Sequence, residues 1–230
     1  MPGLILGIET ATAHGGVALV SGAGGIVGET TLLSEEGHSE RILPALEQLL
    51  KLQGLTLGAV AAVAVSSGPG SFTGLRTGIA TAKGLAFSLR LPLYGIPTLE
   101  ALAAAAPSGA GIVCACLNAR RGEVYRSLFR TGPAGPVRLG PDAIVAAGAF
   151  AAELPEDCLI IGDLPPRWSE WSATRNSRWH PAPELANHPR AAAVALLGLE
   201  ALRQGRPSEL GSLQPRYVRP PDAVVRRTAV

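Results

Sequence analysis

The sequence contains little of what marks several common classes of protein. Aromatic residues make up 4% of the 230 residues, which disfavours a surface built to stack nucleic-acid bases. Charged residues make up 17% and the net charge is +2, too mild to indicate a broadly basic nucleic-acid surface. Lysine is nearly absent, with arginine supplying the positive charge, a bias that we attribute to base composition. No apolar run reaches the roughly 18 residues that a membrane-spanning helix needs.

Cysteine is also scarce. Cys114, Cys116 and Cys158 are an odd number in a chain large enough to fold without disulfides, which indicates reduced thiols and a cytoplasmic protein. Cys114 and Cys116 lie two apart in a predicted strand, so they share a face, and we interpret them as small buried side chains. The first residues contain neither the basic region nor the cleavage site of a signal peptide.

The remaining composition is that of a folded chain. Hydrophobic residues make up 47% and the mean hydropathy is +0.26, which excludes a disordered protein. The length allows one domain or two small ones.

Strands alternate with helices in an order that begins again near residue 108, so the sequence predicts an α/β fold with two similar lobes, 1–107 and 108–230. The second lobe would end in an extended basic tail, which contains Arg216, Arg219, Arg226 and Arg227. The expected strands are 4–9, 15–20, 26–33, 59–65, 92–96, 111–117, 123–130, 136–140 and 158–162, and the expected helices are 39–53, 72–89, 98–106, 147–154 and 190–204, with irregular loops over 164–190.

A glycine-rich segment lies between the expected strand 59–65 and the expected helix 72–89. Backbone N–H groups of Gly68, Gly70 and Ser71 at such a helix start could hold an anion, with Arg76 nearby. The spacing is neither that of a Walker A loop nor that of the dinucleotide fingerprint. A tight turn with close helix packing, in which the Ser71 hydroxyl caps the helix, is the structural alternative.

The two helices 39–53 and 72–89 contain patterns that fit two kinds of packing. Small residues at i, i+4 and i+8 of the second helix would let another backbone approach closely, and the first helix has an apolar stripe. Both patterns suit packing on the chain's own sheet or against a helix of another chain. The candidate interface residues are Ile42, Leu46, Leu49, Gly74, Gly78 and Ala82.

Candidates for catalysis are few. Glu9 and Thr10 end the first strand, where Glu9 could bind Mg²⁺ or instead cap a turn or pair with an arginine. The sequence contains neither the His-Glu-x-x-His motif nor the Gly-x-Ser-x-Gly motif, and we expect His38 to cap a helix or face solvent. The expected hairpin with Arg120, Glu123 and Tyr125 could contact an anion or a partner, or form a solvated turn with an internal ion pair. We predict no catalytic and no metal-binding residues.

Five segments, found in a fixed order, resemble the TsaB (YeaZ) family of bacterial proteins for threonylcarbamoyladenosine (t6A) biosynthesis in tRNA. The most specific is Gly-Pro-Gly-Ser-Phe-Thr-Gly at 68–74, followed by Leu75 and Arg76. The other four are 8–12, 38–44, 118–125 and 215–219, so the resemblance extends over nearly the whole chain.

The resemblance implies an ASKHA fold (the ribonuclease H-like fold of actin and sugar kinases), with dimerisation helices in the lobe 1–107. It implies a cytoplasmic, non-catalytic subunit that forms a heterodimer with TsaD through helices 39–53 and 72–89. TsaD transfers the threonylcarbamoyl group to adenosine 37 of tRNAs that decode ANN codons, and TsaE is the third component. The tRNA would be reached through the complex. No cofactor is expected on the chain alone. ATP or ADP at the interface with TsaD stays open, as does a homodimer of the isolated chain.

The resemblance also leaves two alternatives to a binding subunit. The first is an ASKHA-type ATPase or phosphotransferase that uses Glu9, Thr10 and the Gly68–Gly70 loop. Glu9 and Asn118 stand where relatives often have aspartate, which weighs against nucleotide or Mg²⁺ binding. The second is a metallopeptidase (glycoprotease). The catalytic relative holds a metal with two histidines at i and i+4, and here these positions are His38 and Ile42.

Overall fold

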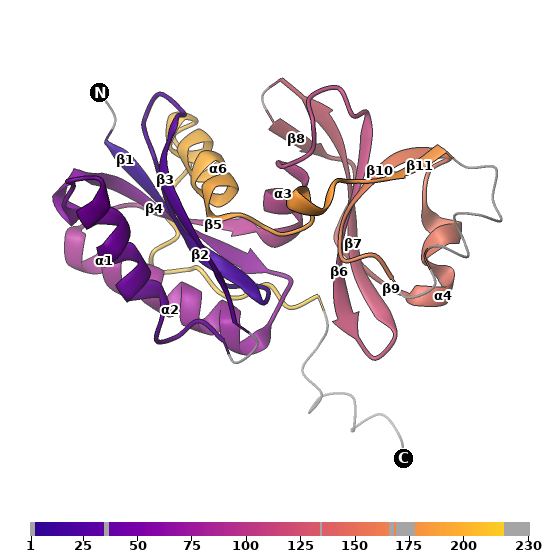
Figure 1. Ribbon diagram of the computed structural model, residues 1–230, viewed down its shortest axis with the longest axis horizontal. Coiled ribbons are helices and arrows are strands. Elements are labelled where there is room, and N and C mark those ends of the chain that lie inside the picture. The colour runs from indigo at the N-terminus through magenta and orange to yellow at the C-terminus, as the bar shows by residue number, and fades with distance from the viewer. Residues whose placement is uncertain (1–2, 35–36, 134, 166–167, 169–177, 219–230) are drawn as a thin grey trace, which may run out of the picture.

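The strands of this protein form two sheets that stand side by side, with helices packed on them (Figure 1). The structure is a computed structural model, and it describes residues 3–34, 37–133, 135–165, 168 and 178–218. The predicted α/β class with two lobes is confirmed. Among the described residues, no helix combines the length and apolar character needed to cross a membrane.

The first sheet has the strand order β3-β2-β1-β4-β5. Strand β1 runs antiparallel to β2 and parallel to β4, and β4 is parallel to β5. Strands β1 and β4 are apolar up to their last residues and buried almost throughout, as expected for strands with helices on both faces. The strands are β1 (Leu4–Glu9), β2 (His14–Val20), β3 (Ile26–Leu33), β4 (Val60–Gly68) and β5 (Leu93–Pro97).

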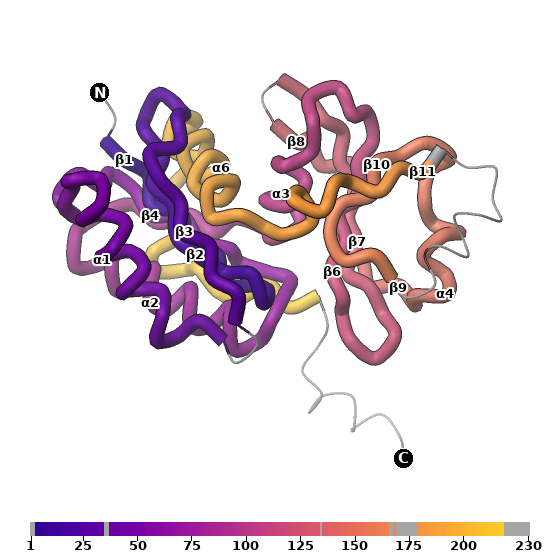
Figure 2. The backbone as a smooth tube through the Cα atoms, viewed as in Figure 1, coloured from indigo at the N-terminus to yellow at the C-terminus, as the bar shows by residue number. Residues whose placement is uncertain are grey.

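Helices cover both faces of the first sheet. Helices α1 (Ile42–Leu52) and α2 (Phe72–Leu89) pack on one face, and α6 (Ala191–Arg203) packs on the other (Figure 2). Helix α6 approaches β1 so closely that a Cβ on Gly7 would lie 2.1 Å from the Ala191 carbonyl oxygen. Helix α6 therefore packs on the first sheet, although it follows the second sheet in the sequence. The lobe predicted for residues 108–230 had included this helix.

The second sheet has the strand order β11-β10-β6-β7-β8, with β9 paired to β7. Helix α3 (Thr98–Ala103) packs on one face through Leu99 and Leu102. The other face is covered by helix α4 (Ala147–Phe150), the short 3₁₀ helix η2 (Ala151–Glu153) and the chain that follows it. The strands are β6 (Ile112–Arg120), β7 (Glu123–Gly132), β8 (Gly135–Arg138), β9 (Ala143–Ala146), β10 (Asp157–Gly162) and β11 (Arg178–Pro181).

Several predicted boundaries are wrong for local reasons. Helix α1 begins at Ile42 rather than 39, because the Arg41 and Ile42 N–H groups both donate to the His38 carbonyl and form a turn. Thr98 does not cap α3, since its hydroxyl accepts from the Gly68 N–H and Pro97 stands at the cap. Strand β11 and the 3₁₀ helix η3 (Glu184–Ala186) lie in the stretch expected to be irregular. Strand β9 was not predicted.

The expected basic tail begins as a packed segment. The Glu209 N–H donates to the Leu93 carbonyl, and the Arg216 N–H donates to the Ser67 carbonyl. The chain after α6 therefore lies against β5 and the end of β4. Arg219, Arg226 and Arg227 lie outside the described residues.

Candidate functional site

A cavity of about 760 Å³ lies between the two sheets. It is bordered by the carboxyl ends of β1, β4, β6 and β10, the edge at which open α/β sheets bind ligands, and its volume is that of a small-ligand pocket. The first lobe contributes the turn after β1 and the start of α2, and the second lobe contributes the β6–β7 hairpin and Asp163. Tyr217 comes from the segment after α6.

The wall formed by the first lobe is a tight connection between β4 and α2. The Ser71 hydroxyl accepts the Gly74 N–H at 3.2 Å and so caps α2, as the structural alternative predicted. The Ser71 N–H donates to the Ala11 carbonyl at 2.7 Å, and a Cβ on Gly70 would lie 2.4 Å from the same oxygen. The Gly70–Ser71 backbone is therefore held against the turn after β1, with Gly70 and Ser71 both lining the cavity.

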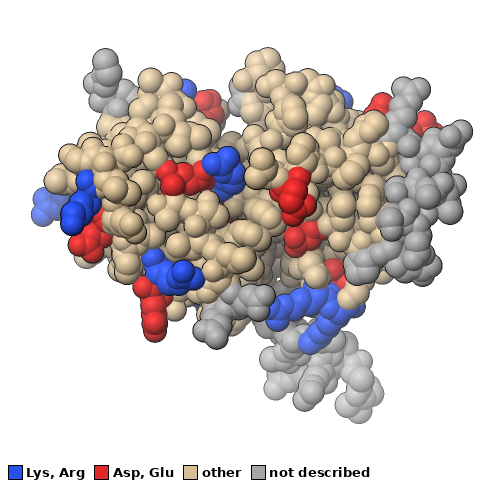
Figure 3. Space-filling model, viewed as in Figure 1, with Lys and Arg blue, Asp and Glu red and all other residues tan. Residues whose placement is uncertain are grey.

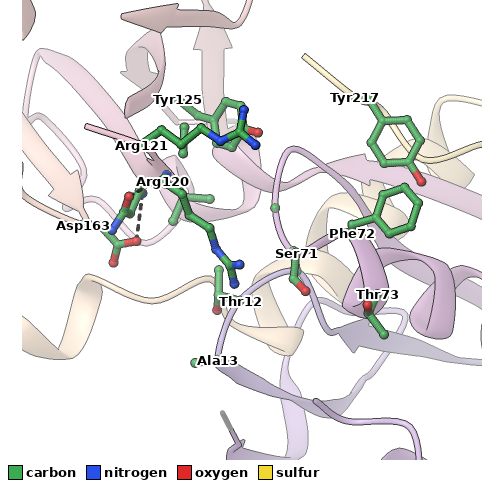
Figure 4. A pocket seen from close by; sticks show the side chains of 15 residues that line it. Thr12, Ala13, Ser71, Phe72, Thr73, Arg120, Arg121, Tyr125, Asp163 and Tyr217 are labelled. Atoms are coloured by element: carbon green, nitrogen blue, oxygen red, sulfur yellow. Dashed lines mark hydrogen bonds between the residues drawn. The ribbon is translucent and has the colours of Figure 1, made fainter. Parts of the chain in front are cut away.

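The wall formed by the second lobe is the β6–β7 hairpin. Arg120 and Arg121 both have positive φ angles, 62° and 52°, a conformation that costs a non-glycine residue on the order of 1 kcal/mol. The Asn118 side chain accepts the Arg120 N–H at 2.8 Å, and the Asp163 carboxylate accepts the Asn118 N–H at 3.0 Å. Arg120 extends from this hairpin toward Thr12 and Ser71 (Figure 4). The local hydrogen bonds thus hold a strained turn that directs an arginine across the cavity.

Of the hairpin residues singled out from sequence, Arg120 and Tyr125 line the cavity. Glu123 pairs in register with Arg120 at the hairpin end and is only half-buried, but it does not line the cavity.

The mouth of the cavity carries an aromatic pair. The rings of Phe72 and Tyr217 stack with centroids 5.4 Å apart. The guanidinium of Arg76 lies 3.8 Å from the Phe72 ring centroid, and its Nε donates to the Tyr217 hydroxyl at 3.1 Å. Phe72 and Tyr217 line the cavity, whereas Arg76 does not.

Glu9 and Thr10 do not reach the cavity. The Glu9 side chain is fully buried and accepts hydrogen bonds from the Ala11 N–H and the Ser66 hydroxyl. The Thr10 hydroxyl donates to the Gly74 carbonyl at 2.8 Å. Of the three roles considered for Glu9, the structure agrees with capping a turn, because its carboxylate accepts the Ala11 N–H in the turn after β1. Gly68 is likewise covered, since a Cβ there would lie 2.5 Å from the Arg216 carbonyl oxygen.

Burial raises the pKa of Glu9 from its ordinary value of 4.5 to about 7, although hydrogen bonds from Ser66 and the backbone oppose the shift. Between these two values the folded chain binds more protons than the unfolded chain, so its free energy of unfolding should fall as pH rises from about 4.5 to 7. Glu9→Gln keeps the shape and removes the titration. Relative to the parent protein, we expect the variant to gain on the order of 3 kcal/mol between pH 4.5 and 8, measured by urea unfolding. If the difference in the free energy of unfolding between variant and parent stayed constant from pH 4.5 to 8, the raised pKa of a buried Glu9 carboxyl would be contradicted.

The six residues proposed as an interface belong instead to the chain's own core. Ile42, Leu46, Leu49 and Ala82 are buried in the cluster between the first sheet and its helices. Gly74 and Gly78 face Thr10, because a Cβ on either glycine would lie 2.1 Å from an oxygen of that residue. The sequence patterns therefore reflect packing on the chain's own sheet. The side chains that α1 and α2 expose are different ones.

His38 neither caps a helix with its side chain nor faces solvent. It is 2% exposed, and its Nε2 lies 2.9 Å from the Thr12 carbonyl oxygen. Because a carbonyl oxygen only accepts, Nε2 is the donor of this hydrogen bond. Ile42, at the position of the second histidine of the catalytic relative, is a core residue. The described residues contain no group of three or more His, Cys, Asp or Glu side chains that could hold a metal ion.

Cys114, Cys116 and Cys158 are free, buried and packed in one cluster of the second lobe, as interpreted from sequence. Burial raises the pKa of the Cys158 thiol to about 12, with Asp157 adding to the shift.

Sequence reasoning missed Thr12, Phe72, Asp163 and Tyr217 as cavity residues. Asp163 had a usable signal, because it directly follows a predicted strand and the carboxyl ends of parallel strands meet at one edge. Phe72 and Tyr217 lie in two of the five segments that carry the family resemblance, but their pairing could not be predicted, since it depends on where the segment after α6 packs.

The fold and the cavity between the lobes define a protein of the ASKHA type. The family model "TsaD: tRNA N6-adenosine threonylcarbamoyltransferase" matches residues 11–135. The crystal structure of YeaZ from Pseudomonas aeruginosa superposes with a TM-score of 0.78 at 27% identity, covering 94% of this chain and 99% of that one.

Two curated relatives are named as proteins of tRNA threonylcarbamoyladenosine biosynthesis. The chain is 43% identical over 123 residues to the tRNA threonylcarbamoyladenosine biosynthesis protein TsaB of Escherichia coli, covering 53% of this chain and 52% of the relative. It is 35% identical over 126 residues to TsaB of Bacillus subtilis, covering 55% of each. The matches thus span about half the length of these curated relatives. The chain belongs to the matched family, and within it to the TsaB (YeaZ) proteins.

Proposed function

We propose that this chain is a non-catalytic subunit in t6A biosynthesis on tRNA, which dimerises with TsaD and works with TsaE as the third component. The proposal is supported by the family and by the names of its relatives, which are t6A biosynthesis proteins. In this proposal ANN-decoding tRNAs are the substrate of the complex, and adenosine 37 is the modified base.

The observation that carries the proposal is the outer side of α1 and α2. Leu43 is 51% exposed, Leu52 73% and Phe87 76%. On α2, Ala80 and Gly84 are also exposed, at i and i+4, with Phe87 three residues further on. Large apolar side chains beside small residues allow another helix to approach closely and bury apolar area. We propose that TsaD covers this face.

The first lobe supports a binding role over a catalytic one. Glu9 and Thr10, the groups that an ATPase or phosphotransferase would direct into the cleft, are both buried and bonded to their own chain. Any ATP or ADP in the assembly would then sit where this chain meets TsaD. Hydrolysis of ATP with Mg²⁺ by the isolated chain, lost in the Glu9→Gln variant, would favour the ATPase instead.

The test is the t6A content of tRNA in cells depleted of this protein, measured by nucleoside mass spectrometry. We expect t6A to fall and to return with the parent chain and with a Leu185→Glu control, in which a 91% exposed residue of η3 is changed. We expect no recovery with Phe87→Glu. Unchanged t6A after depletion would overturn the proposed function.

A further inference from the structure

The mouth of the cavity presents two aromatic rings and several arginines in one place. The aromatic side is Phe72 and Tyr217, with the Arg76 guanidinium lying over the Phe72 ring and hydrogen-bonded to the Tyr217 hydroxyl. Arg120 and Arg121 stand on the β6–β7 hairpin across the cavity (Figure 4). We call these five residues the mouth cluster.

The two rings are exposed although they lie in a chain with few aromatic residues. Phe72 is 52% exposed and Tyr217 is 40% exposed. The position of each ring is fixed by its own backbone, because Phe72 is the first residue of α2 and the Arg216 N–H, next to Tyr217, donates to the Ser67 carbonyl. An aromatic pair whose position is held in this way loses little conformational freedom when a flat ligand stacks on it.

The charge at the mouth is positive. Figure 3 shows basic side chains gathered near the tip of the β6–β7 hairpin, where Arg120 and Arg121 stand beside one carboxylate, that of Glu123, which pairs in register with Arg120. Among the described residues that line the cavity, Asp163 is the one carboxylate, and it accepts the Asn118 N–H. Both arginines have positive φ angles in this turn, and the hydrogen bond from the Arg120 N–H to the Asn118 side chain helps to hold it. An anionic ligand therefore meets positive charge across the mouth from the aromatic pair.

We infer that the mouth cluster binds a single-stranded RNA segment. An unpaired base would stack on the Phe72–Tyr217 pair, and the flanking phosphates would meet Arg120 and Arg121. Stacking on aromatic side chains combined with arginine contacts to the backbone is how proteins bind unpaired nucleotides. The inference rests on the proposed function, because that function makes an RNA the substrate of the assembly. A base held inside a duplex could not lay its face on these rings.

The test is fluorescence anisotropy with the full chain and an unpaired, fluorescein-labelled RNA of about 12 nucleotides, within the usual site size of such surfaces. Phe72→Ala should weaken binding at least about fivefold, because a stacked base contributes that much or more. Arg120→Gln should weaken binding and lower the slope of log K against log salt by about 0.7, the value for one lost phosphate contact.

Two matched controls separate the mouth cluster from general charge and exposure. Arg130→Gln removes an exposed arginine from the other end of the same hairpin, opposite Ile112. Phe87→Ala removes an exposed phenylalanine from the other end of α2. Both should bind RNA as the parent chain does. Equal weakening by Arg130→Gln and Arg120→Gln, or no RNA binding at about 50 mM salt, where such contacts are strongest, overturns the inference. Equally tight binding of an acidic peptide also overturns it.

The outcomes also distinguish this inference from the proposed function. Phe72→Ala should keep its complex with TsaD while losing RNA affinity, and Phe87→Glu should do the reverse. If the TsaD complex and the t6A requirement hold while Phe72→Ala binds RNA normally, only the inference about the mouth cluster fails.

Discussion

Alanine at Gly78 is expected to destabilise the protein by about 2–5 kcal/mol, whereas alanine at Gly84 of the same helix should stabilise it by about 1 kcal/mol. A Cβ on Gly78 would lie 2.1 Å from the Thr10 hydroxyl oxygen. Thr10 is fully buried and donates to the Gly74 carbonyl, so it cannot move without losing that hydrogen bond. A Cβ on Gly84 meets nothing within 4 Å, which leaves only its gain in helix propensity.

The two variants are controls for each other, because they make the same substitution six residues apart in α2. Urea unfolding of both gives the two differences in the free energy of unfolding. Opposite signs are the expected result. A neutral Gly78→Ala would mean that α2 does not pack on the turn after β1 as the structure has it, and that its small-residue stripe is free to meet a partner.

Glutamate at Phe87 is expected to weaken binding to TsaD by about 100-fold or more. Phe87 is the most exposed large apolar residue on α1 and α2, and burying an unpaired carboxylate in an apolar interface costs several kcal/mol. The change should leave folding intact, since the Phe87 side chain does not belong to the core clusters of the first lobe. Isothermal titration of TsaD with the parent chain and the variant measures the effect.

Leu185→Glu is the matched control, an exposed apolar residue on η3 that is replaced by the same charge. It should bind TsaD as the parent chain does. Equal affinities of Phe87→Glu and the parent chain would remove the outer side of α1 and α2 from the interface, whatever the family membership.

Local patterns predicted most of the elements because those patterns record burial. The stripe Ile42, Leu46 and Leu49 predicted an amphipathic helix, and these residues are buried in α1. The pattern could not say which surface covers the stripe, so the same residues also suited an interface. In the structure the first sheet covers them. Leu43, which the same periodicity placed on the stripe, is exposed instead, as is Leu52, which the stripe did not include.

The candidate site was predicted only in part because it depends on contacts between distant segments. Gly70, Ser71 and Arg120 were found from local motifs, and they do line the cavity. Arg76 and Tyr217 are 141 positions apart, and their contact exists because the chain after α6 returns to the first sheet. Glu9 stood at the expected strand end, but its neighbours Ala11 and Ser66 direct its carboxyl into the core. A sequence gives the end of a strand more readily than the direction of its last side chain.

The measurement that tests the central claim most directly is size-exclusion chromatography with light scattering on the parent chain mixed with TsaD of the same organism. The account predicts one complex that holds a single 23.6 kDa chain for each TsaD, formed with sub-micromolar affinity, as an interface of standard size allows. Two separate peaks, unchanged when TsaE and ATP are added, would contradict it and would move the chain toward an activity of its own.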